Sequence, residues 1–121
     1  LAIKNAIDNN ELVVIHGDRF ANDAPYMETN LMGHQAKFPN GPYYLAARFN
    51  KPVSFVFAFK ETAKHYHFYA SPPKKYPKIK SIADRKIISG NILKDYIPYL
   101  EDKIKKYPYQ WFNFYDFWDR K

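Results

Sequence analysis

The chain has 121 residues, enough for one folded domain or for part of a larger one. Its 19 Lys and Arg against 12 Asp and Glu give a formal charge of +7, which favours an anionic partner such as nucleic acid, anionic phospholipid or an acidic carrier protein. The absence of cysteine excludes disulfides and thiolate metal sites.

The N-terminal part predicts the end of a helix followed by a buried strand. Apolar residues in the range 1–7 follow helical spacing, and residues 8–10 have a composition that stops helices. Residues 12–15 form a short continuous apolar run, which is typical of a strand buried on both faces of a parallel sheet. Open α/β sheets place their ligand sites at such strand ends, where Asp18 and Arg19 follow.

A loop, a short strand and a helix are predicted next. Residues 20–29 lack periodicity and read as a loop, and residues 30–38 predict a short strand in which Gly33 allows a bulge or a close backbone approach. Asn40 is predicted to cap the following helix, with Pro42 in its first turn, where proline is usually found.

The predicted strands of the middle of the chain form a hairpin. The short helix ends before Pro52, and residues 53–60, rich in Val and Phe, are the clearest strand of the sequence. Residues 65–70 are predicted to be its antiparallel partner. The proline-rich and lysine-rich residues 71–80 predict an exposed connection.

The last predicted element is an amphipathic helix. Residues 87–88 suggest a short strand, and Asn91 is predicted to cap the helix that follows and ends before Pro108. Pro98 is expected to kink this helix, whose apolar stripe consists of Leu93, Ile97, Leu100 and Ile104. The elements together predict an α/β fold, a mixed sheet with flanking helices.

Several short motifs follow one another along nearly the whole chain. They are a hydrophobic strand that ends in Asp, a Phe-Pro-x-Gly-Pro turn, a Leu-Ala-x-Arg helix, a Lys-Pro-Val strand start and a Gln-Trp-Phe tail, at residues 13–18, 38–42, 45–48, 51–53 and 110–112. In these motifs and their order the chain resembles the lipid A biosynthesis acyltransferases, of the lauroyl and myristoyl type. Those membrane-surface enzymes move a fatty acyl chain from acyl carrier protein onto a glycolipid.

The catalytic signature of that family is missing here. It is a His with an acidic residue four positions later, upstream of the Asp-containing strand. The positions four after His16, His34, His65 and His67 hold Phe20, Phe38, Tyr69 and Ser71. Because the chain also lacks an initial Met and starts inside a predicted helix, we expect residues 1–121 to be the C-terminal half of an acyltransferase domain, inactive alone.

The resemblance implies a fold, an activity and partners. The fold would be the C-terminal part of a glycerolipid-acyltransferase-like fold. The activity would be transfer of a fatty acyl chain from a thioester of acyl carrier protein or CoA to a glycolipid or aminolipid acceptor. It implies no cofactor, no metal and no nucleic-acid partner. The enzyme would work on an anionic lipid surface, at the cytoplasmic face of the bacterial inner membrane.

The resemblance also implies site residues. Asp18 would support the catalytic machinery, and Arg19, a permanently charged bidentate donor, would hold a phosphate or carboxylate. The substrate-binding turn would consist of Phe38, Pro39, Asn40 and Gly41, whose backbone N–H groups suit an anion or an oxyanion. The alternatives are a strand-ending turn with a local ion pair, and a helix-capping turn without a ligand.

The histidines allow two interpretations. His16 and His34 could act as general bases, because imidazole titrates near neutrality, or could be structural. His65 and His67 share one strand face and would bind a metal only if a third ligand joined them. A solvated strand face is the alternative.

Aromatic residues make up 19% of the chain, more than one small core usually needs. Such a surplus often lies in interfaces, ligand grooves or membrane-contact belts. Together with basic residues, the expected membrane contacts are Lys74, Lys75, Lys78, Trp111 and Trp118. The alternatives are a solvated basic loop and an aromatic tail packed across the core.

A different class of function also fits the composition. Basic residues interleaved with aromatic ones, as in residues 65–69 and 74–76, are what a non-catalytic surface for single-stranded nucleic acid needs. Against this, arginine is scarce beside lysine, and the aromatics form no RNA-recognition signature.

Overall fold

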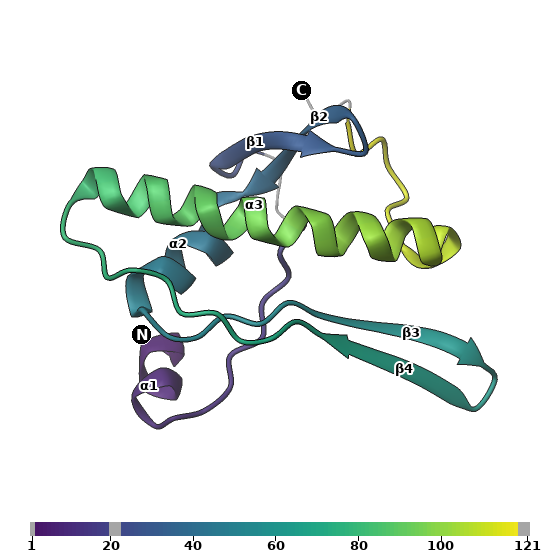
Figure 1. Cartoon of the computed structure of the whole chain (residues 1–121), viewed down its shortest axis with the longest axis horizontal. Coiled ribbons are helices and arrows are strands. Elements are labelled where there is room, and N and C mark those ends of the chain that lie inside the picture. The colour runs from purple at the N-terminus through teal and green to yellow at the C-terminus, as the bar shows by residue number, and fades with distance from the viewer. Residues whose placement is uncertain (1, 20–22, 119–121) are drawn as a thin grey trace.

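The computed structural model of the protein describes residues 2–19 and 23–118 (Figure 1). The elements in chain order are α1 (Ala2–Asp8), β1 (Tyr26–Leu31), β2 (His34–Pro39), α2 (Asn40–Phe49), β3 (Val56–Thr62), β4 (His65–Ala70), α3 (Ile82–Lys106) and a 3-10 turn, η1 (Pro108–Gln110). The protein is therefore mixed α and β. In the described ranges the strands form two antiparallel pairs, β1 with β2 and β3 with β4.

The expectation of a mixed sheet is corrected. Residues 12–15, which were to supply a parallel strand, pair with no strand of the described chain. A continuous apolar run becomes a strand only where a neighbour accepts and donates its backbone hydrogen bonds, and here no neighbour does.

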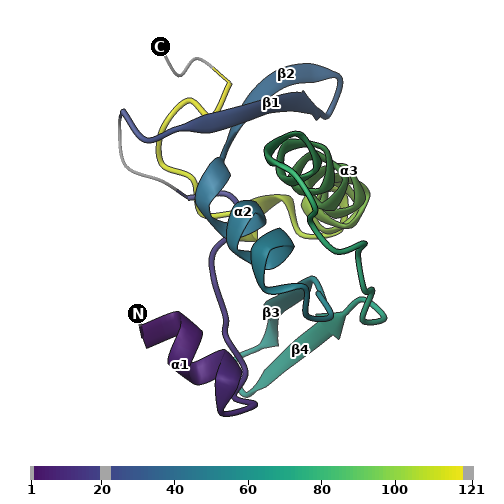
Figure 2. The same cartoon turned by 90° about the vertical axis from the view of Figure 1, so that its left-hand side faces the viewer.

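The long helix α3 organises the structure (Figures 1 and 2). It runs between the two hairpins, with β1 and β2 on one side, β3 and β4 on the other, and α2 packed beside it. The buried core joins α3 to α2 and to the β1–β2 pair through Leu31, Ala36, Phe38, Tyr43, Ala47, Ile88, Ile92, Leu93, Ile97 and Leu100. The predicted stripe of α3 is confirmed, because three of its residues are buried and Ile104 packs against them.

The β1–β2 hairpin replaces the single strand predicted for residues 30–38. Met32 and Gly33 both have positive φ angles, 53° and 82°, as a two-residue hairpin turn of the primed type requires. Glu101 of α3 stabilises the turn by accepting a hydrogen bond of 2.8 Å from the Met32 N–H. The turn therefore depends on a residue distant in the sequence.

The boundaries of α2 were predicted correctly, but its N-cap was not. Asn40 is the first helical residue, and Pro39 in extended conformation is the cap. The backbone N–H of Asn40 donates to the Pro25 carbonyl at 3.0 Å, which ties the start of α2 to the chain entering β1. At the other end, Asn50 adopts the left-handed conformation and its Nδ2 donates to the Tyr76 carbonyl.

The first residue of α3 is Ile82, ten residues before Ile92, where a helix capped by Asn91 would start. The suggested strand at residues 87–88 is wrong, because both lie inside this helix. Ser81 caps it by accepting from the Asp84 N–H at 3.1 Å, a capping pattern that the sequence carries and that we did not recognise. Pro98 lies within the helix.

The hairpin of β3 and β4 was predicted, with β4 at the expected residues and β3 shifted towards its C-terminal end. Its inner face packs on α3 and the residues after it: Phe57 stacks on Tyr96 at 6.1 Å and Phe59 on Tyr107 at 4.2 Å. The Tyr107 hydroxyl also donates to Glu61. The outer face of the hairpin, with Tyr66 and Phe68, is exposed.

The basic connection between β4 and α3 is held by a polar cluster. Lys74 pairs with Val53 through two backbone hydrogen bonds of 2.9 Å, and its Nζ lies 2.7 Å from Asp95 Oδ2. The Tyr76 hydroxyl donates to the same carboxylate at 2.7 Å. Burial opposes ionisation of Asp95, but the hydrogen bonds from Lys74 and Tyr76 outweigh it and lower the pKa of this carboxyl below its ordinary value of 3.8.

Asp95 is therefore expected to make stability fall in acid. Its contribution is present above its unfolded-state pKa, about 3.9, and is lost as the pH falls through the lower pKa of the folded state. Asp95→Asn should reduce the loss of stability between about pH 6 and about pH 3, measured from urea midpoints at each pH. An unchanged pH dependence in this variant would show that other carboxyl groups carry the effect.

Candidate functional site

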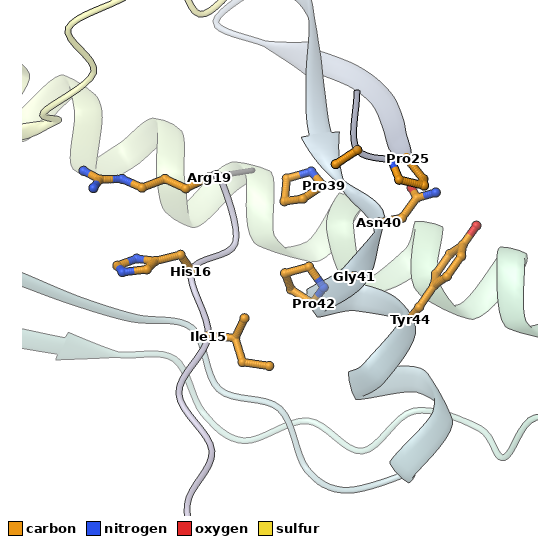
Figure 3. Close-up of a pocket in the computed structure, with 10 residues that line it drawn as sticks. Ile15, His16, Arg19, Pro25, Pro39, Asn40, Gly41, Pro42 and Tyr44 are labelled. Carbon is orange, nitrogen blue, oxygen red and sulfur yellow. The ribbon is translucent and has the colours of Figure 1, made fainter. Parts of the chain in front are cut away.

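Two segments distant in the sequence line one open crevice of about 600 Å³ (Figure 3). One wall comes from the chain after α1, and the other from the turn that leads from β2 into α2. The lining residues are Ile15, His16, Arg19, Ala24, Pro25, Pro39, Asn40, Gly41, Pro42 and Tyr44. The structure thus brings together Arg19, Pro39, Asn40 and Gly41 of the predicted site.

The interior of the crevice is mainly apolar. Ile15 extends towards Pro42, whereas the side chains of His16 and Arg19 extend away from the α2 turn (Figure 3). The Arg19 guanidinium therefore lies away from the turn at residues 38–42 (Figure 3). An apolar surface between Ile15 and three prolines suits a hydrocarbon chain better than an anion.

The first wall is attached to α2 by one buried hydrogen bond. The Tyr43 hydroxyl donates to the Gly17 carbonyl at 2.7 Å. Burial raises the pKa of Tyr43 above its ordinary value, with smaller contributions from Tyr96 and Asp18, so the hydroxyl keeps its proton at neutral pH. The contact is close, because a Cβ on Gly17 would lie 3.1 Å from the Tyr43 oxygen.

Asp18 lies behind the crevice wall. Its Oδ2 accepts a hydrogen bond of 3.0 Å from Trp111 Nε1, and it is not among the lining residues. Its negative charge is a secondary cause, after burial, of the raised pKa of Tyr96. In this structure Asp18 fixes the wall to the C-terminal tail, so any part it takes in catalysis is that of a positioning residue.

Arg19 is anchored to the same tail. Its Nη2 donates to the Phe112 carbonyl at 3.3 Å. In the described ranges the ion pairs join Lys4 to Asp8, Lys74 to Asp95 and Lys103 to Asp102, and none involves Arg19. The positive charge of Arg19 at the crevice wall therefore forms no ion pair with a carboxylate of the described residues.

The start of α2 offers few donors to a ligand. The N–H of Asn40 is used by Pro25, and Pro42 has none, which leaves Gly41 among these first residues. The expected cradle of several N–H groups is therefore reduced to one. The Asn40 Oδ1 is buried without a hydrogen-bond partner.

Phe38 lies beneath the turn. It is 0% exposed, and its ring packs edge-on against Phe117 at 5.6 Å and against Tyr96 at 6.4 Å. The expectation that Phe38 touches a substrate is corrected: it supports Pro39 and Asn40 from the core.

The histidines lie at separate places. The His34 ring is 6.4 Å from that of Trp118, and the His67 ring stacks on Tyr69 at 4.1 Å, as expected for structural or solvated residues. Only His16 lines the crevice. Across the residues that the structure describes, no group of three or more His, Cys, Asp or Glu side chains could hold a metal ion.

The five residues expected to contact a membrane do not share one surface. Residues 71–81 run from beside the middle of α3, where Lys74 contacts Asp95, to its start, and the tail follows the other end of α3 (Figure 1). Lys74 is held by Asp95, whereas Lys75 and Lys78 are exposed. In the tail, Trp111 is half-buried, and Trp118 Nε1 donates to the Leu31 carbonyl at 3.2 Å.

No helix in the described part of the chain is both long enough and apolar enough to cross a bilayer.

Sequence reasoning missed several crevice residues. Ile15 was assigned to a buried strand, and Pro25 to a loop. Tyr43 and Tyr44 received no role, although Tyr43 fixes one wall to the other. The Tyr-Tyr pair directly after the Pro-Asn-Gly-Pro turn was the available signal. Comparisons with protein families, with curated proteins and with solved structures find no match to this chain.

Proposed function

We propose that this chain is the C-terminal part of a membrane-associated acyltransferase of the lipid A biosynthesis type, with the corresponding glycerolipid-acyltransferase-like fold. It would move a fatty acyl chain from a thioester of acyl carrier protein or CoA to a glycolipid or aminolipid acceptor. The reaction would take place at an anionic membrane surface, on the cytoplasmic face of the bacterial inner membrane.

One observation carries the proposal. Two of the motifs on which the resemblance rests, the segment ending at Asp18 and Arg19 and the turn at residues 38–42, are about 20 residues apart and line one crevice or lie directly behind it. A third motif, at residues 110–112, touches the same wall through Trp111 and Phe112. Motifs that share a site are expected to gather in space.

The apolar crevice suits the acyl chain of the donor. Ile15, Pro42 and the ring of Tyr44 would bury its methylene groups, and burial is worth about 0.8 kcal/mol for each. The Gly41 N–H is the donor available for the oxyanion that forms when the acceptor attacks the thioester carbonyl. The Asn40 Oδ1, which lacks a donor, would accept from the acceptor's hydroxyl or amine after rotation of the side chain.

The proton chemistry requires groups outside this chain. A base must take the proton of the acceptor hydroxyl or amine as it attacks, and the C–S bond then breaks as the tetrahedral intermediate collapses and the thiolate takes up a proton. The resemblance assigns this to a His and an acidic residue upstream. The encoding gene tests this directly: we expect that pair ahead of Leu1, and an upstream reading frame without it would contradict the assignment.

Acyl-chain binding is the prediction for the chain itself. Octanoyl-CoA should bind in the crevice, and Ile15→Asp should weaken binding roughly tenfold, the loss expected when about two methylene groups are no longer buried. Isothermal titration calorimetry and amide chemical shifts of Ile15, Gly41 and Tyr44 would measure it. Leu12→Asp is the matched control, because Leu12 precedes the crevice on the same segment and is exposed.

Acetyl-CoA distinguishes binding through the acyl chain from binding through the nucleotide. It carries the same phosphates and should bind much more weakly if the hydrocarbon supplies the affinity. Equal affinity for the two thioesters, or equal effects of Ile15→Asp and Leu12→Asp, would contradict an acyl site in this crevice.

A second function is favoured by the outer face of the β3–β4 hairpin. Tyr66 and Phe68 are 55% and 70% exposed, and Lys60 lies opposite Tyr66 in the strand register. Exposed rings beside a lysine suit base stacking in a non-catalytic module for single-stranded nucleic acid. The other candidate surface, residues 74–76, is not available for stacking because Tyr76 is buried.

The two functions can be separated by their ligands. Salt-dependent binding of an oligothymidylate that is lost in a Tyr66→Ala, Phe68→Ala variant, with no binding to phosphatidylglycerol vesicles, would support the nucleic-acid module. Vesicle binding without oligonucleotide binding would support the acyltransferase.

A further inference from the structure

Residues 12–16 combine exposed apolar side chains with a backbone that lacks hydrogen-bond partners in the described chain. Leu12 is 96% exposed and Val14 91% exposed, and Ile15 is exposed at the crevice. Within the described ranges, no hydrogen bond joins the backbone of residues 12–16 to any other residue. Four consecutive β-branched or leucine side chains therefore lie on an unpaired backbone.

The unpaired stretch is bounded on both sides. Before it, the Glu11 N–H donates to the Ala6 carbonyl at 2.8 Å and closes the end of α1. After it, the Gly17 carbonyl is taken by Tyr43, and Asp18 by Trp111. The structure therefore fixes both ends of this segment and leaves the middle open, on the surface that leads into the crevice (Figure 3).

The backbone decides what kind of partner fits. A lipid surface would cover Leu12 and Val14 but would leave the N–H and C=O groups without partners, which costs several kcal/mol for each group in hydrocarbon. A neighbouring β-strand satisfies these groups and covers apolar side chains together. Leucine and β-branched residues are also the composition of a strand between two others.

The charged residues at the two ends of residues 12–16 restrict which partner strand fits. Glu11 is exposed at the start of the segment, and Arg19, which has no described carboxylate partner, follows its end. A partner strand with a basic residue beside Glu11 and an acidic residue beside Arg19 would be electrostatically complementary.

We infer that residues 12–16 are a docking strand for an apolar β-strand of another polypeptide segment, which carries an acidic residue opposite Arg19. The inference rests on the proposed function in one respect: the partner strand would border the crevice wall to which Ile15 and His16 belong. The pairing itself is independent of acyl transfer, so the two ideas can fail separately.

Capped peptides with seven alternating valine and threonine residues between two charged end residues match the nine positions from Glu11 to Arg19 and are suitable probes. One has lysine at its N-terminus and glutamate at its C-terminus, and the other has the reverse order. In parallel pairing the first peptide brings lysine to Glu11 and glutamate to Arg19, and in antiparallel pairing the second does. Amide hydrogen exchange of residues 12–16 in the 121-residue chain is the measurement.

One peptide is expected to slow exchange about tenfold at a concentration about ten times its Kd, and its identity gives the strand direction. Val14→Pro should abolish the protection, because it removes an N–H and cannot continue a strand. Val14→Thr is the matched control: it keeps the N–H and the β-branched shape at the same exposed position, and protection should persist.

Four results would overturn the inference. They are slow exchange of residues 12–16 in the monomer without a peptide, no protection by either peptide, protection by phosphatidylglycerol vesicles instead, and protection that rises with the chain's own concentration. The last two would assign the segment to a lipid surface or to a second copy. Octanoyl-CoA binding stays measurable in each case and reports on the proposed function separately.

Discussion

Phe38→Ala is expected to lower the free energy of unfolding by about 3–5 kcal/mol, the range for removing a buried aromatic side chain. Phe38 is fully buried where β2, α3 and the C-terminal tail meet, and its ring contacts Tyr96 and Phe117. Its loss leaves a cavity beneath Pro39 and Asn40. Urea unfolding followed by tryptophan fluorescence would measure the change.

The matched control is Phe114→Ala. Phe114 is 92% exposed, and its ring lies 6.4 Å from that of exposed Phe112, so its removal should change stability by less than about 0.5 kcal/mol. Equal losses in the two variants would show that Phe38 does not support the core as described. A destabilised but folded Phe38→Ala protein should also bind octanoyl-CoA less tightly, because the turn above the cavity loses its support.

Tyr43→Phe is expected to cost about 1–3 kcal/mol, because it leaves the Gly17 carbonyl without its buried donor. The ring itself is preserved, so the core keeps its volume. The larger consequence is local: the wall formed by residues 15–19 loses its hydrogen bond to α2. The amide chemical shifts of Gly17 and Asp18 should change, because the carbonyl between them loses its donor.

Tyr44→Phe is the control for this effect. Tyr44 is adjacent in sequence and lines the crevice, but its described contact is of its ring with Arg85 at 5.1 Å and not of its hydroxyl. It should leave the amide chemical shifts of Gly17 and Asp18 unchanged. If both variants behave alike, the hydrogen bond from Tyr43 does not hold the crevice together.

Much of the local structure follows from the sequence. Three features illustrate this: the Pro-Asn-Gly start of α2, the Val-rich and Phe-rich hairpin of β3 and β4, and the apolar stripe of α3. Each depends on contacts between residues three or four positions apart or joined by a short turn. Their residues therefore determine them almost alone. Errors arose where a signal was present but was not recognised, as with Ser81 and Asp84 at the start of α3.

Other features depend on distant partners. Met32 is an unusual residue for a primed turn, and Glu101, 69 residues away, accepts its N–H. The candidate site was likewise predicted only in part. The sequence identified the turn at Pro39 and Arg19 as site residues. It did not indicate that Ile15 faces the turn while the Arg19 side chain points away (Figure 3).

The amino-acid sequence by itself determined α2, the β3–β4 hairpin and the apolar stripe of α3, because short-range spacing and turn chemistry are sufficient for these. Tertiary structure alone decided which side chains meet across the crevice, and that the apolar residues 12–15 lie unpaired. The physical reason is that a strand requires hydrogen bonds from a neighbour that its own sequence does not contain.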